Sequence, residues 1–121
     1  MNITENSSKE VKKMRVWHDG GDGITDVSKK HFKRLYKRIQ PIEVFVSKDG
    51  VFTFQLYGTH KRTNEPVVIL ESGFNCGYGG TGPHGTVWAL ELLGVPKSLR
   101  KLVFSREYLI VNFRSGYPRA K

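Results

Sequence analysis

Residues 67–93, VVILESGFNCGYGGTGPHGTVWALELL, contain the strongest structural signal in the sequence. Residues 67–70 are all apolar, as is typical of a strand that is buried on both faces of a sheet. A glycine-rich segment follows, and apolar residues then recur at helical spacing up to Leu93. Pro83 suits the first position of a helix, and Gly94 suits the position after its end. The stretch therefore predicts a central strand, a tight loop and a helix.

Two further strands are predicted upstream, over residues 42–48 and 51–57. Both runs are rich in β-branched and aromatic residues. The pair Asp49-Gly50 between them is preferred in two-residue type I′ turns. A hairpin with this turn places Phe45 opposite Phe54, and it directs Val46 to the other face of the sheet.

A basic amphipathic helix is predicted over residues 26–39. Thr25 or Asp26 offers a side-chain oxygen as the N-cap, and Pro41 ends the helix. Apolar residues recur three and four positions apart in one stripe: Val27, Phe32, Leu35, Tyr36 and Ile39. The remaining surface carries six cations: Lys29, Lys30, Lys33, Arg34, Lys37 and Arg38.

The remaining signals complete an α+β fold. Residues 14–18 predict a first strand, residues 96–104 a short helix, and residues 108–113 the last strand. We expect a mostly antiparallel sheet of four or five strands with two or three helices, because short connections favour neighbouring antiparallel strands. The expected order of elements is β-α-β-β-β-α-(α)-β.

The 121-residue chain has the length of one small domain. We expect that domain at residues 14–114, between a flexible N-terminal tail at 1–13 and a basic C-terminal tail at 115–121. The single Cys excludes a disulfide framework and fits a reducing compartment. No apolar run reaches the roughly 18 residues of a membrane helix. A cytoplasmic protein with no membrane association is therefore expected, and homo-oligomerisation is left open.

The charge of the chain favours contact with polyanions. Lys and Arg number 20 and Asp and Glu 11, which gives a formal net charge of +9. Residues 96–121 add seven basic residues against the single acidic residue Glu107. Because clustered cations neutralise phosphates, one hypothesis is a nucleic-acid-binding or protein-binding accessory module that acts through the basic helix and the basic C-terminus.

The glycine-rich segment leads to the main functional hypothesis. A strand, a glycine-rich turn and a helix can bind phosphate, because backbone N–H groups approach the anion at the positive end of the helix. Gly77, Gly79 and Gly82 match G-x-G-x-x-G, but no Gly-Lys-Ser/Thr follows and a Rossmann acidic residue is missing. Residues 67–95 contain no Lys or Arg, so neutralising charge must come from elsewhere, for example Arg106.

We therefore expect non-enzymatic binding of a small phosphorylated ligand, a nucleotide, at this turn. Tyr78 or Trp88 would stack on a base, and the phosphates would meet Arg106 or His84. The predicted ligand-binding residues are Gly77, Tyr78, Gly79, Gly80, Thr81, Gly82, His84, Trp88, Arg106 and Glu71. The alternative interpretation is that the glycines only allow close packing of the loop under the helix.

The patterns for catalysis or metal binding are unspecific, so the sequence favours a protein without catalytic, metal or cofactor residues. His18 with Asp19 and Asp22 could form an acid–base pair or a metal site, but nothing else lies at ligand spacing, and a surface loop is the simpler interpretation. Cys76 is interpreted as a small buried side chain. His84-Gly85-Thr86 is like the His-Gly-Thr run of ADP-ribosyltransferases, but here the run opens a helix.

The glycine-rich segment resembles the signature of a family of small uncharacterised proteins from bacteria and phages. In that family an aromatic-containing run leads into Gly-Tyr-Gly-Gly-Ser/Thr-Gly-Pro and an Ala/Leu-rich helix. The matching residues are Phe74, 77–83, Ala89, Leu90, Leu92 and Leu93. The chain departs from the family at Cys76, where Trp is usual, and at His84. The resemblance spans about residues 71–113, carries no activity, and implies a phage or mobile-element protein, for example one that sequesters a host defence signal.

Overall fold

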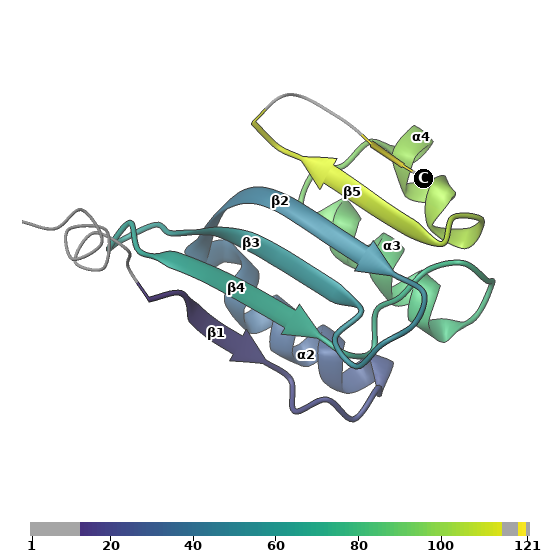
Figure 1. The fold of residues 1–121 in the computed structure, drawn as a ribbon, viewed down its shortest axis with the longest axis horizontal. Coiled ribbons are helices and arrows are strands. Elements are labelled where there is room, and N and C mark those ends of the chain that lie inside the picture. The colour runs from purple at the N-terminus through teal and green to yellow at the C-terminus, as the bar shows by residue number, and fades with distance from the viewer. Residues whose placement is uncertain (1–12, 115–118, 121) are drawn as a thin grey trace, which may run out of the picture.

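A mixed sheet with helices on one face forms the described part of the chain, which is residues 13–114 and the backbone of 119–120 in the computed structural model (Figure 1). The elements are β1 (Arg15–His18), α2 (Thr25–Leu35), the 3-10 helix η1 (Tyr36–Arg38), β2 (Ile39–Ser47), β3 (Phe54–His60), β4 (Pro66–Glu71), α3 (Thr81–Leu92), α4 (Lys97–Arg100), the 3-10 helix η2 (Lys101–Phe104), β5 (Tyr108–Asn112) and β6 (Arg119–Ala120).

The strand order is β1-β4-β3-β2-β5-β6. β1 pairs parallel with β4, and every other neighbouring pair is antiparallel. The predicted α+β class, with a mostly antiparallel sheet, is therefore confirmed. The predicted tails, residues 1–13 and 115–121, lie mostly outside the described residues. The two-residue strand β6 within the second of them was not predicted.

The hairpin of β2 and β3 has a different register from the predicted one. Val46 pairs with Phe54, so the predicted pairing of Phe45 with Phe54 is wrong by one residue. A loop longer than two residues connects the strands, and the N–H of Ser47 donates to the carbonyl of Thr53 at 2.8 Å. The observed register buries Val46 and Phe54 completely on the same face. Burial on the helix-covered face therefore outweighs the turn preference of Asp49-Gly50.

The basic helix is shorter than predicted and is capped differently. α2 ends at Leu35, and Ile39 begins β2 with its side chain buried in the core. Ile24 is the N-cap of α2 and no side chain caps the helix. Thr25 Oγ1 donates instead to the carbonyl of Gly73 at 3.0 Å. The early end follows from strand pairing, because the chain at Ile39 is already hydrogen-bonded along β3.

α3 ends as predicted but begins earlier. The helix starts at Thr81, two residues before Pro83. At its end Gly94 adopts a φ of 82°, and its N–H donates to the carbonyl of Glu91 at 3.0 Å. The N–H of Val95 reaches back to the carbonyl of Leu90, which completes a Schellman motif. The predicted C-terminal stop at Gly94 is therefore confirmed.

We expect Gly58→Ala to destabilise the protein. Gly58 lies opposite a bulge in β2, and a Cβ at this position would lie 2.3 Å from the carbonyl oxygen of Gln40. The backbone must move to admit the methyl group, which lowers the free energy of unfolding by about 1–3 kcal/mol. Gly79→Ala is the control, because a Cβ there meets nothing within 4 Å. Urea denaturation of both variants tests the register, and equal stabilities would contradict it.

Candidate functional site

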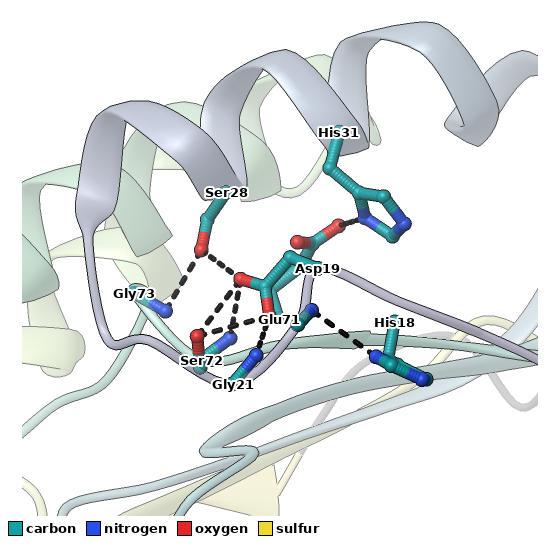
Figure 2. A network of polar contacts seen from close by, with 9 residues as sticks. His18, Asp19, Gly21, Ser28, His31, Glu71, Ser72 and Gly73 are labelled. Carbon is teal, nitrogen blue, oxygen red and sulfur yellow. Dashed lines mark hydrogen bonds and ion pairs between the residues drawn. The ribbon is translucent and has the colours of Figure 1, made fainter.

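Asp19, directly after β1, is the centre of a polar network that joins three segments of the chain (Figure 2). Its carboxylate accepts hydrogen bonds from the hydroxyl of Ser28 in α2, from the N–H of Ser72 at 2.8 Å, and from the N–H of Gly21 at 3.0 Å. Ser28 Oγ also accepts the N–H of Gly73 at 2.8 Å. Burial opposes the charge of Asp19, but these hydrogen bonds outweigh it, and its pKa lies below the usual value. Asp19 is therefore ionised at neutral pH.

Glu71, the last residue of β4, is fully buried beside His31 of α2. Glu71 Oε2 lies 2.6 Å from His31 Nδ1. Burial, together with the charge of Asp19, raises the pKa of Glu71 to about 10. Burial lowers the pKa of His31; Arg34 and His18 act in the same direction, and Asp19 opposes them. Both partners of the pair are therefore uncharged at neutral pH.

The directions of these pKa shifts indicate which atoms of Asp19, Glu71 and His31 carry protons. Glu71 Oε1 is buried and has no donor from which an ionised carboxylate could accept a hydrogen bond. A side-chain hydrogen bond between Glu71 and Asp19 contributes to the raised pKa, and a protonated Glu71 is the partner that can donate it. Oε2 then accepts the Nδ1–H of His31, which leaves Nε2 with a free lone pair. Asp19 and Glu71 together hold one proton and one negative charge.

A groove of about 350 Å³ opens next to this pair, between α2 and the end of β1. Its lining residues, which define the His31 groove, are His18, Asp19, Val27, Lys30, His31 and Arg34. His31 is 9 % exposed, whereas Lys30 and Arg34 are exposed. In Figure 2 the second ring nitrogen of His31 points away from Glu71. The groove thus combines a neutral imidazole with two cations and the ionised carboxylate of Asp19.

A second groove, of about 500 Å³, lies at the C-terminal end of α2. Its lining residues, which define the basic groove, are Lys37, Arg38, His60, Lys61 and Arg62. The N–H of Lys61 donates to the carbonyl of Arg38 at 2.9 Å and so fixes the β3–β4 turn against η1. No acidic side chain is among these lining residues. Repulsion between the cations raises the energy of the empty groove, and a bound anion would relieve it.

The six cations predicted to contact nucleic acid do not all share one side of the helix. Four of them line the two grooves: Lys30, Arg34, Lys37 and Arg38. Lys30, Arg34 and Arg38 follow at intervals of four residues along one side of α2 and η1, and Lys37 lines the same groove as Arg38. Lys29 lies elsewhere, with its ammonium 5.5 Å from the centre of the Trp88 ring. Lys33 is exposed.

The glycine-rich segment packs closely against its neighbours. The N–H of Gly77 donates inward to the carbonyl of Val103 at 2.8 Å. A Cβ on Gly82 would lie 2.1 Å from Asn75 Oδ1. Tyr78 is 44 % exposed, and its hydroxyl accepts a hydrogen bond from Asn75 Nδ2 at 3.1 Å. Close packing, the alternative interpretation of these glycines, therefore accounts for Gly77 and Gly82.

The other predicted ligand-binding residues lie in separate places. Glu71 belongs to the His31 cluster, Trp88 packs against the buried ring of Phe74, and Arg106 is exposed before β5. Gly79 and Gly80 lie at the turn before α3. Thr81 and His84 border a third groove, of about 420 Å³. The residues that define this N-terminal groove are Gly23, Ile24, Thr25, Asp26, Lys29, Thr81 and His84.

Two helices begin at the N-terminal groove, and neither has a side-chain cap. The first residues of α2 and of α3 both line it. Two partial positive charges and the ammonium of Lys29 therefore lie around one groove, with the carboxylate of Asp26 opposing them. His84 is exposed there, and its Nδ1 lies 2.8 Å from the carbonyl of Gly80.

Sequence reasoning missed Ser28, His31 and Ser72. Ser28 and His31 are buried on the same side of α2 as Phe32 and Leu35, at positions i, i+3, i+4 and i+7. Val27, predicted in the apolar stripe, is 40 % exposed. Two polar residues that continue an apolar stripe in register are the signal that could have revealed the site. Asp19 does lie in a loop, as interpreted, but it is half-buried there and accepts hydrogen bonds from two other segments.

Comparisons of the chain with protein-family models, with curated proteins and with solved structures found no match, so the interpretation of the grooves depends on their geometry. Among the described residues, no group of three His, Cys, Asp or Glu side chains is placed to hold a metal ion. The same part of the chain has no helix with the length and apolarity to cross a membrane. Cys76 is buried, which raises its pKa to about 11.

We expect Glu71→Gln to change how stability depends on pH. Between pH 7 and 9 the folded protein keeps the proton of Glu71, whereas the unfolded chain, with a pKa near 4.5, has lost it. The free energy of unfolding of the wild type therefore falls as pH rises, by at most about 1.4 kcal/mol per pH unit. Glutamine does not titrate, so the variant should lack this contribution.

His31 does not affect this window, because its pKa is lowered from 6.5 and the group is neutral in both states above pH 7. Urea denaturation of both proteins at pH 7, 8 and 9 measures the difference. Parallel pH profiles for wild type and Glu71→Gln would show that Glu71 carries no buried proton.

Proposed function

We propose that the protein binds nucleic acid along the basic side of α2 and in the basic groove at its end. The observation that carries the proposal is the convergence of four cationic side chains and His60 on one groove without an acidic lining residue. Phosphates are the anions that such a groove stabilises best when several cations act together. The formal net charge of +9 adds a long-range attraction to any polyanion.

The row of cations suits a polymer better than a single phosphate. Lys30 and Arg38 are eight residues apart, a rise of about 12 Å along a helix. This length exceeds the size of one phosphate group, so consecutive phosphates of a strand can contact the row. A strand in the basic groove would therefore continue along α2 towards the His31 groove.

We expect Lys37→Gln with Lys61→Gln to weaken binding of a labelled 20-nucleotide strand, because both lysines are exposed and line the basic groove. The slope of log affinity against log salt concentration should fall by about two, because each of these lysines would neutralise about one phosphate of the strand. Fluorescence anisotropy between 50 and 200 mM salt measures this slope.

Lys97→Gln with Lys101→Gln is the matched control. These two lysines are also exposed, but they belong to α4 and η2 and line none of the three grooves. The control should keep both the affinity and the slope of the wild type. An equal loss of affinity in the two double variants would mean that net charge alone binds the strand, and would refute the proposed surface.

A second candidate function is binding of a small phosphorylated ligand in the N-terminal groove. Two uncapped helix N-termini and Lys29 around one groove favour it. A nucleotide phosphate would accept hydrogen bonds from the free N–H groups of both first turns. If the chain is a phage or mobile-element protein, as the resemblance of its glycine-rich segment implies, sequestration of a host signalling nucleotide would be a concrete form of this function.

We expect a matching nucleotide to raise the melting temperature of the protein by several degrees at saturating concentration, through mass action. Lys29→Gln should reduce this shift, because Lys29 supplies the ammonium of the groove. Lys33→Gln, an exposed position four residues further along α2, should keep it. A nucleotide panel in thermal denaturation tests both variants, each against its own ligand-free baseline. A shift that both variants keep would place the ligand elsewhere.

A further inference from the structure

We propose that the His31 groove is an acid–base site that cleaves the backbone of RNA, with His31 as the base. This inference rests on the nucleic-acid binding proposed above, because the row of cations along α2 would lead the strand to this groove. The proposed function assigns only nucleic-acid binding to this surface, and the inference adds a chemical reaction.

The contact of Nδ1 with Glu71 fixes the orientation of the His31 ring. Its Nδ1 lies 2.6 Å from Glu71 Oε2, and Glu71 is completely buried. Asp19, which stands behind Glu71, is itself held by Ser28, Ser72 and the backbone of Gly21. A carboxyl group behind an imidazole sets its tautomer and stabilises the imidazolium that forms when the ring takes a proton. Nε2 of His31 is thus held with its lone pair available.

Burial of the Glu71 carboxyl group costs free energy that a purely structural core would avoid. Glu71 buries a carboxyl group with one oxygen that lacks a donor in the ionised state. An apolar residue at this position would pack against α2 without that penalty. Groups perturbed by burial and by a specific charged neighbour, next to a groove, are characteristic of sites that move protons.

The titratable and charged groups around His31 come from every element that packs against it. Glu71 stands at the end of β4, Asp19 and His18 at the end of β1, and Arg34 one turn further along α2. Asp19 carries the negative charge of the Asp19–Glu71 pair, and this charge stabilises a protonated His31. Arg34, on the groove side, is placed to contact a phosphate that lies against the imidazole.

RNA is the substrate because its 2′-hydroxyl lies beside the phosphate that it can attack. Nε2 of His31 takes the proton of the 2′-hydroxyl, and the 2′-oxygen forms a bond to phosphorus. The bond from phosphorus to the 5′-oxygen breaks, and that oxygen takes a proton from the ammonium of Lys30, the exposed cation of the groove. The products are a 2′,3′-cyclic phosphate and a 5′-hydroxyl, and proton transfer through solvent from His31 to Lys30 restores both groups.

The test is incubation of a 12-nucleotide RNA with the full chain in EDTA, with products identified by mass spectrometry. The expected products carry 2′,3′-cyclic phosphate and 5′-hydroxyl ends. A DNA strand of the same sequence, or the RNA with a single 2′-deoxy residue at the cut, should bind but stay intact at that position. These substrate controls leave the protein unchanged.

His31→Ala should lower the cleavage rate at least 100-fold and keep the affinity for RNA. Lys30→Gln, at an exposed position, should lower the rate, and Lys97→Gln, an exposed lysine of α4 outside the groove, is its control. Glu71→Gln tests a positioning residue. It keeps a hydrogen-bonding side chain but cannot pass a proton to Asp19 and take up negative charge beside a protonated His31, so the acid limb of the pH–rate profile should move to lower pH.

The outcomes separate the two proposals. Loss of cleavage with retained binding in His31→Ala supports the acid–base site. Binding of RNA without cleavage anywhere between pH 5 and 9 overturns this site and leaves the proposed function standing, and so does cleavage that His31→Ala retains at the wild-type rate. Failure to bind any strand overturns the proposed function, and the inference that rests on it.

Discussion

The hydrogen bonds that Asp19 accepts hold the site together. They bring the residue after β1, the first turn of α2 and the residue after β4 to one carboxylate. The parallel pairing of β1 with β4 makes this possible, because the carboxyl ends of the two strands lie side by side. Asp19 thereby accepts a hydrogen bond from Ser72, which lies 53 positions away in the chain. These bonds, together with that of Thr25 to the carbonyl of Gly73, fix the loop that leads into α2 and so help to place His31 beside Glu71.

Asp19 and Glu71 avoid electrostatic repulsion because only one of the two carboxyl groups is ionised. Two ionised carboxylates in a buried position would repel each other, and one of them lacks donors. The many hydrogen bonds to Asp19 favour its charge, so the proton goes to Glu71. The protonated Glu71 then presents an acceptor to His31 on its other oxygen. Burial of Glu71 and the charge of Asp19 therefore together decide the protonation of Glu71 and, through Glu71, the tautomer of His31.

Patterns of residues close together in the sequence were enough to predict most of the fold. The site, in contrast, depends on contacts between residues that are far apart in the sequence. The apolar strand β4 and the stop at Gly94 follow from residues close together in the chain, and both were predicted. The register of the β2–β3 hairpin depends on which face α2 and α3 cover, so the turn preference alone placed Phe45 wrongly. Glu71 was predicted to bind a ligand, but its partner His31 lies 40 residues away. Only the parallel pairing of β1 with β4 brings Asp19 to the same point.

The glycine-rich segment and the polar cluster are parts of one arrangement. A Cβ on Gly73 would lie 2.6 Å from the carbonyl oxygen of Ile24 and 2.7 Å from Ser28 Oγ. A side chain there would push the start of α2 away from the end of β4. Ser28 would then lose the N–H of Gly73, and its hydroxyl would leave Asp19. Glycine at this position thus serves the cluster by allowing close approach, and its position follows from packing, independently of any phosphate at the turn.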